Sequence, residues 1–192
     1  YITDYELLTL KISKEELEDL IQSNKEGGVP EQDYYLYFSA YLALLSIRQY
    51  NRKKILIFAN KLEDIIKIYK YVKMIHRSSF SDLIIPFIEC TDGPFKTLIK
   101  QLNESDIGIF INVYKVGEGI NIPSLDTVLF SDNMGSSIRI TQSCLRPIRL
   151  DNNNPDKIAK IIIPLIYEED GNDKGEGGND KGEGGDLKIK TF

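Results

Sequence analysis

The sequence contains no tryptophan, two cysteines and one histidine in 192 residues. Cys90 and Cys144 lie far apart and form no metal-binding spacing, so we expect free thiols in a reducing intracellular compartment, the cytoplasm or the nucleus. The single histidine, His76, stands in a polar stretch after a helical segment and is expected at the surface. Histidine-based catalysis and a metal centre therefore have no support.

Long apolar runs are also missing. None approaches the roughly 20 residues that a membrane-spanning helix needs, so no membrane partner is expected. The sequence lacks the phosphate-binding pattern G-x-x-x-x-G-K-[ST] and an acidic cluster of the Walker B type after a strand. A nucleotide hydrolase that is complete in this chain is therefore excluded.

Basic charge is scarce for a nucleic-acid binder. The net charge is −5, but residues 168–186 alone hold eight acids and two lysines, which leaves the remainder at about neutrality. The same segment repeats GNDKGEG in tandem and has no apolar residue to bury, so it is expected to be a flexible linker before residues 187–192. Independent binding of nucleic acid by charge alone is not expected.

Apolar periodicity divides the rest of the chain into alternating strands and helices. An extended segment, 1–12, precedes a helix with Ser13 as N-cap and Glu16 completing a capping box, and a second helix follows Pro30. Strands are expected at 55–60, 83–88, 107–113, 127–131 and 159–166, and helices at 61–75, 95–102 and 136–150. Alternation of this kind predicts an α/β fold with an open, mostly parallel sheet and helices on both faces. Pro164 places the last strand at an edge, or itself at a strand end.

The stretch from Asp106 to Leu150 carries the candidate chemistry. A loop with Gly117 and Gly119 joins two buried strands, and the segment after them places Gln142, Arg146 and Arg149 on one helical face. Glycines allow the main chain to approach a ligand closely, and guanidinium groups match phosphate oxygens in pairs. The pattern is suited to a polyphosphate.

These residues resemble two motifs of superfamily 2 helicases. VGEGINIPSLDTVLF resembles motif V, QSCLRPIR resembles motif VI, and the strand ending in IFAN resembles motif IV. The resemblance covers the second, C-terminal RecA-like lobe, a P-loop NTPase-type fold without the P-loop. It places the lobe at residues 51–167, with residues 1–50 leading into it.

The resemblance implies two sets of site residues. Arg146 and Arg149 are the expected catalytic residues, facing the γ-phosphate of ATP bound with Mg²⁺ mainly on the first lobe. The expected ATP-binding residues are Gly119, Asn121, Gln142, Arg146 and Arg149. The expected contacts to a DNA or RNA strand are Asn60, Thr91, Gly93, Val113 and Tyr114.

Three functions stay open on the sequence. The first is the motor lobe of an ATP-dependent helicase or translocase, partnered by the first lobe and inactive alone. The second is a degenerate lobe that serves as a binding module without ATPase activity. Asn121 in place of an acid, Leu145 in place of glycine and Val113 in place of threonine are departures in that direction. The third is a stand-alone α/β nucleotide-binding domain.

Overall fold

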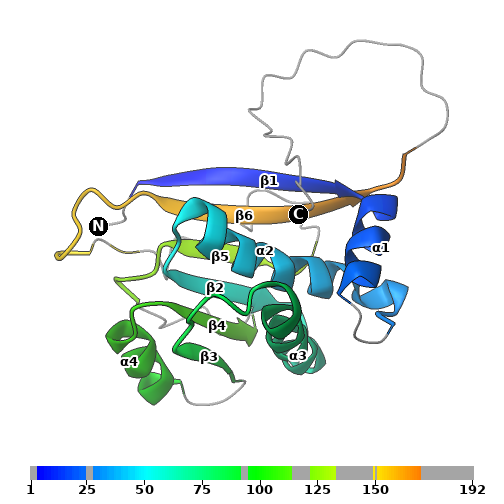
Figure 1. Ribbon diagram of the computed structural model, residues 1–192. Helices are drawn as coiled ribbons and strands as arrows, with labels where there is room; N and C mark the ends of the chain where they lie inside the picture. The colour runs from blue at the N-terminus through cyan, green and yellow to red at the C-terminus, as the bar shows by residue number, and fades with distance from the viewer. Residues whose placement is uncertain are drawn as a thin grey trace, which may run out of the picture.

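The computed structural model describes residues 4–24, 28–91, 95–113, 122–132, 149 and 151–169. Six strands form one sheet in the order β1-β6-β5-β2-β4-β3, and every pair of neighbours is parallel (Figure 1). The strands are β1 Tyr5–Ser13, β2 Lys54–Ala59, β3 Phe87–Cys90, β4 Gly108–Val113, β5 Thr127–Phe130 and β6 Ala159–Tyr167. The prediction of an open parallel α/β sheet is confirmed.

The helices cover both faces of this sheet. They are α1 Lys14–Ser23, the 3₁₀ turn η1 Glu31–Asp33, α2 Tyr34–Tyr50, α3 Leu62–Ser79 and α4 Lys96–Glu104. The capping box of α1 forms as expected, because Ser13 Oγ accepts the Glu16 N–H at 3.2 Å and the Glu16 carboxylate accepts the Ser13 N–H at 3.1 Å. Helices α1 to α3 pack on one face, and α4 packs on the other.

Alternating side chains in the fully buried central strands build the two apolar layers. In β2, Ile55, Ile57 and Ala59 join the cluster under α2 and α3, whereas Leu56 and Phe58 join the cluster on the α4 face. The chain moves in one direction across the sheet from β1 to β2 to β3 and then turns back to β4. Right-handed crossovers place the connections before and after that reversal on opposite faces.

The first fifty residues are part of this core. β1 pairs along its whole length with β6. Helix α2 is buried almost all round, since it lies between the sheet and its neighbours, which explains its lack of a polar stripe.

The third strand begins later than the sequence predicts. Residues 83–85 are irregular, and β3 starts at Phe87, directly after Pro86. Proline has no N–H for the ladder, and the neighbouring strand β4 begins only at Gly108, opposite Phe87. The residues before Pro86 therefore have no strand to pair with, although Leu83 and Ile85 still pack on the core.

Strand β6 lies inside the sheet, between β1 and β5. The expectation that the strand with Pro164 is an edge strand is therefore wrong. The pairing of β6 with β5 ends at Ile162, however, and beyond that point β1 is its only paired neighbour among the described residues. The Lys160 and Ile166 N–H groups both point to the β5 side, where they donate to Asp126 O and Tyr35 Oη. The missing N–H of Pro164 falls on the same side, where no described strand pairs with it.

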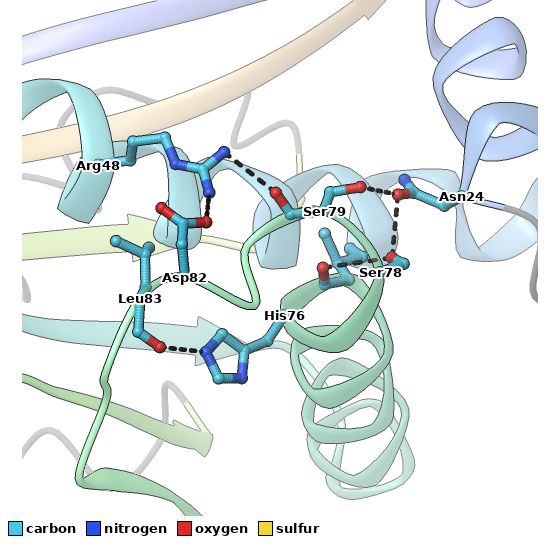
Figure 2. Close-up of polar contacts among 8 residues, drawn as sticks. Asn24, Arg48, His76, Ser78, Ser79, Asp82 and Leu83 are labelled. Atoms are coloured by element: carbon cyan, nitrogen blue, oxygen red, sulfur yellow. Dashed lines mark hydrogen bonds and ion pairs between the residues drawn. The ribbon is translucent and has the colours of Figure 1, made fainter. Parts of the chain in front are cut away.

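The single histidine, His76, lies within α3, because this helix continues to Ser79. The residue is half-buried, so the prediction of a surface position is wrong. His76 Nε2 lies 2.8 Å from the Leu83 carbonyl oxygen (Figure 2). Cys90 is half-buried and is in no disulfide.

A polar network fastens the ends of α1, α2 and α3 together (Figure 2). Asn24 is 2% exposed, and its Nδ2 donates to Tyr37 Oη and, at 3.1 Å, to the Leu20 carbonyl. Its Oδ1 accepts the hydroxyls of Ser78, at 3.0 Å, and Ser79. Arg48 of α2 completes the junction through the Ser79 carbonyl at 3.0 Å, with Asp82 as its ion-pair partner.

We predict that Asn24→Ala lowers the free energy of unfolding by about 2–4 kcal/mol, because it removes the four hydrogen bonds of a buried side chain, including the one to the buried Tyr37 hydroxyl. Urea denaturation followed by circular dichroism measures the change. Gln22→Ala, on the exposed side of the same helix, is the control and should change stability by less than about 0.5 kcal/mol. Equal effects of the two variants would contradict the role of the network.

Candidate functional site

Because all six strands are parallel, their carboxyl ends lie along one edge of the sheet. Asn60 follows β2, Thr91 follows β3, Val113 ends β4, and Ser131 follows β5. The connection after β2 crosses the face of α3, whereas the one after β4 leads to Ile122 and Leu125 in the opposite cluster. Neighbouring strands whose connections leave for opposite faces form a crevice, which is where ligands bind in such sheets.

The described candidates for nucleic-acid binding all lie at this carboxyl edge, but they differ in how exposed their side chains are. Asn60 is exposed, and its Nδ2 donates to Asp132 Oδ2 at 2.7 Å. Thr91 is half-buried and its N–H donates to the Ile111 carbonyl at 3.2 Å. The Val113 side chain is buried in the core cluster, so only its main chain is left to meet a ligand. Gly93 and Tyr114 lie outside the described residues.

A hollow of about 200 Å³ opens between the carboxyl ends of β2 and β5 and the start of α2. Its lining is mostly polar, and its ionisable groups are one lysine and two aspartates, so it is close to neutral. The lining residues are Gln32, Tyr35, Leu36, Asn60, Lys61, Asp64, Ser131 and Asp132. Burial raises the pKa of the Asp64 carboxyl above its usual range.

Two buried polar groups at this edge have no hydrogen-bond partner among the described residues. They are Ser131 Oγ, which lines the hollow, and Asn112 Nδ2 at the end of β4. Ser131 is 2% exposed and Asn112 is fully buried. Buried polar groups are normally paired, so such groups mark a place where a ligand or water completes the bonding. Sequence reasoning missed both, because each reads as an ordinary residue of a buried strand.

The opposite, amino edge carries Arg149. Its side chain is exposed, and its carbonyl oxygen accepts a hydrogen bond from Lys157 Nζ at 2.9 Å. Lys157 lies two residues before β6 and also donates to the carbonyl of Pro123, which precedes β5. Arg149 therefore lies next to the entry to β5, at the other edge of the sheet from Asn60.

The remaining ATP-binding candidates, Gly119, Asn121, Gln142 and Arg146, lie outside the described residues. Asn121 directly precedes Ile122 in the sequence, and Ile122 is the first described residue after the glycine loop. The structure brings Pro123, two residues after Asn121 in the sequence, close to Arg149, and both lie at the other edge of the sheet from Asn60 and Thr91.

Asp126 fixes the amino edge. Its carboxylate accepts the N–H groups of Lys53, at 2.8 Å, and Lys54, at 3.3 Å, as well as the Thr127 hydroxyl at 3.0 Å. Burial is the largest influence on this carboxyl and raises its pKa in spite of these bonds. A second polar hollow, of about 430 Å³, lies beside it and is lined by Arg52, Lys53, Asp126, Asp156 and Lys157 among others.

Within the described ranges, no group of His, Cys, Asp and Glu side chains is arranged to hold a metal ion. Among the same residues, no helix combines the length and apolarity needed to cross a membrane.

No protein-family model matches this sequence. A search of curated proteins likewise finds no match. The fold does match solved structures, although the identities are low.

The ATP-dependent Type ISP restriction-modification enzyme LlaBIII bound to DNA matches with a TM-score of 0.62 at 19% identity, over 90% of this chain and 12% of that one. The E. coli DEAD-box protein SrmB, bound to regulator of ribonuclease activity A, matches with a TM-score of 0.56 at 12% identity, over 86% and 79%. Domain 2 of the DEAD-box helicase Mss116p, bound to an RNA duplex, matches with a TM-score of 0.51 at 13% identity, over 83% and 54%.

The chain thus spans about an eighth of the first of these proteins and about half of the third. At these identities the likeness concerns the fold. The described sheet and helices have a RecA-like α/β fold, which they share with these structures.

Proposed function

We propose that this chain is the C-terminal motor lobe of an ATP-dependent helicase or translocase. The observation that carries the proposal is the separation of the candidate residues onto two edges of one rigid sheet. The nucleic-acid candidates Asn60 and Thr91 lie at the carboxyl edge, and Arg149 lies at the amino edge. A motor lobe needs two such surfaces, because it holds a nucleotide and a strand at the same time.

The amino edge is the proposed nucleotide side. Arg149 presents an exposed guanidinium, which suits the γ-phosphate of ATP, and Arg146 lies one helical turn earlier in the sequence. Gly119, Asn121 and Gln142 complete the proposed contacts. The described residues hold no acidic cluster for Mg²⁺, so the metal would be held by the phosphates and the first lobe. The bound ATP supplies the phosphoryl group that is hydrolysed, and this lobe stabilises the charge that develops.

The carboxyl edge is the proposed nucleic-acid side. Asn60, Thr91, Gly93, the main chain of Val113 and Tyr114 offer amide, hydroxyl and main-chain groups, which contact phosphates and sugars without reading sequence. The near-neutral charge outside the tail fits a grip by positioned hydrogen bonds rather than by a basic surface. Closure of the two lobes around ATP would shift this grip along the strand.

The burial of the Val113 side chain favours a second candidate, a lobe that binds without hydrolysis. A Walker A motif in the first lobe of the same protein would support the motor. A first lobe without that motif would support the binding module. Measurable ATP affinity of this chain alone would instead favour a stand-alone nucleotide-binding domain.

We predict that Arg149→Ala, in the protein with both lobes, lowers the rate of nucleic-acid-stimulated ATP hydrolysis by a factor of about 10³ or more, because an arginine finger contributes roughly 10³–10⁵. Steady-state phosphate release measures the rate. Arg77→Ala, an exposed arginine in the last turn of α3, is the control and should leave the rate unchanged. A rate near the wild-type value for Arg149→Ala would remove Arg149 from the mechanism.

Asn60→Ala should weaken single-strand binding by about three- to tenfold, as expected for loss of one net hydrogen bond of about 1 kcal/mol. The KM for ATP should stay unchanged, because Asn60 lies at the other edge. Fluorescence anisotropy with a labelled oligonucleotide measures the affinity, with Asn153→Ala, on an exposed turn before β6, as the control. Unchanged affinity in Asn60→Ala would place the strand elsewhere.

Ser131→Ala should leave the free energy of unfolding unchanged or raise it by about 1 kcal/mol, since the hydroxyl is buried without a described partner. Ser39→Ala is the matched control. That hydroxyl is also buried but donates to the Tyr35 and Phe130 carbonyls, at 2.6 and 3.1 Å, so its loss should destabilise the fold. Thermal and urea unfolding compare the two variants, and destabilisation by Ser131→Ala as large as that by Ser39→Ala would show that Ser131 serves the fold alone.

A further inference from the structure

Lys157 is a buried cation at a position where an apolar side chain could be buried without losing hydration. Only 6% of the residue is exposed, and its ammonium donates to two main-chain carbonyl oxygens, those of Pro123 and, at 2.9 Å, of Arg149. A buried ammonium is unfavourable unless hydrogen bonds replace its lost hydration. Burial accordingly lowers the pKa of Lys157.

The two carbonyls belong to segments that are distant in sequence. Pro123 follows Asn121 by two residues at the end of the glycine loop, and Arg149 ends the arginine segment. Two hydrogen bonds to one nitrogen hold the two oxygens within about 6 Å of each other. One side chain therefore joins the ends of the two segments that carry the proposed nucleotide contacts.

We propose that Lys157 is a positioning residue for ATP hydrolysis, which holds the main chain of Arg149 at a fixed distance from that of Pro123. The proposal rests on the function proposed above. Lys157 touches neither substrate nor the reacting phosphate in this scheme. It sets where the Arg149 guanidinium meets a nucleotide that also contacts the chain around Asn121.

The expected effect of losing Lys157 on catalysis follows from how an arginine finger acts. Such a group acts on charge that develops in the transition state, so a shift of its main chain lowers kcat more than it raises KM. Misplacement by about 1 Å can lower the rate about a hundredfold. Loss of the anchor should therefore appear in the chemical step, while affinity for the nucleic-acid strand at the opposite edge stays unchanged.

Lys54 provides a matched control within the same sheet. It is also 6% exposed, and its ammonium donates to the main-chain carbonyls of Leu102, Asn103 and Ser105 at the end of α4. Burial lowers its pKa as well. None of its partners is a proposed site residue, so Lys54 has the same chemistry without the same position.

The experiment compares Lys157→Met with Lys54→Met in the protein with both lobes. Both variants should lose stability, and assays are run at a temperature where circular dichroism shows both to be folded. We expect Lys157→Met to lower kcat for ATP by about ten- to a hundredfold, with oligonucleotide affinity within about twofold of wild type. Lys54→Met should keep kcat within about threefold, and Lys157→Arg, which retains the cation, should recover part of the lost rate.

Equal kcat in the two methionine variants, relative to wild type, would overturn the proposal. If Lys157→Met does not fold, Lys157→Gln is measured instead. Its amide NH₂ keeps two N–H donors, but its side chain is uncharged and too short to hold both carbonyls in place, so a wild-type kcat there overturns the proposal equally. Arg149→Ala separates the two levels. A wild-type rate in that variant rejects the proposed role of Arg149 at the nucleotide, on which the role of Lys157 rests, whereas a slow Arg149→Ala beside a fast Lys157→Met rejects only the role of Lys157.

Discussion

The common direction of six hydrogen-bonded strands is the constraint on which the rest of this structure depends. Parallel pairing buries both faces and forces every connection to cross the sheet from its carboxyl edge to its amino edge. The chain therefore leaves the sheet at the carboxyl edge each time a strand ends, and the residues there include the exposed Asn60 and the half-buried Thr91. It returns before the next strand to the amino edge, where Pro123 and Arg149 lie beside Lys157.

This geometry gives the described sheet two edges, which the proposed function assigns to different ligands. At the carboxyl edge, Asn60 and Asp132 bridge the ends of β2 and β5 beside a hollow lined by Ser131, whose hydroxyl has no partner among the described residues. At the amino edge, the Lys157 ammonium and the Asp126 carboxylate hold the main chain that leads into β5, β6 and β2. The strands β2, β4 and β5 are buried along their whole length, so under the proposed function a movement at one edge is transmitted to the other through a packed core.

Much of the fold could be predicted from local patterns. The Ser13 capping box, the helical period of α3 and the buried runs of β2 and β4 are signals carried by neighbouring residues, and the structure confirms them. The late start of β3 and the interior place of β6 could not be predicted in this way. Both depend on which strand lies alongside, and that is decided by partners far away in the sequence.

The candidate site shows the same limit. Arginine spacing and glycines predict a phosphate site from the sequence, but no local pattern marks Lys157, because a lysine before a strand is normally a solvated residue. Its role depends on two carbonyls, 34 and 8 residues away, that only the fold brings together. Ser131 likewise becomes notable only when the structure buries its hydroxyl without a described partner.

The most direct test is hydrogen–deuterium exchange in the protein with both lobes, with a non-hydrolysable ATP analogue alone and with an oligonucleotide alone. The account predicts that the analogue protects peptides around residues 122–126 and 149, whereas the oligonucleotide protects those around residues 59–62, 91 and 113. Protection of the carboxyl-edge peptides by the nucleotide alone, or of the same peptides by both ligands, would contradict the assignment of two ligands to two edges.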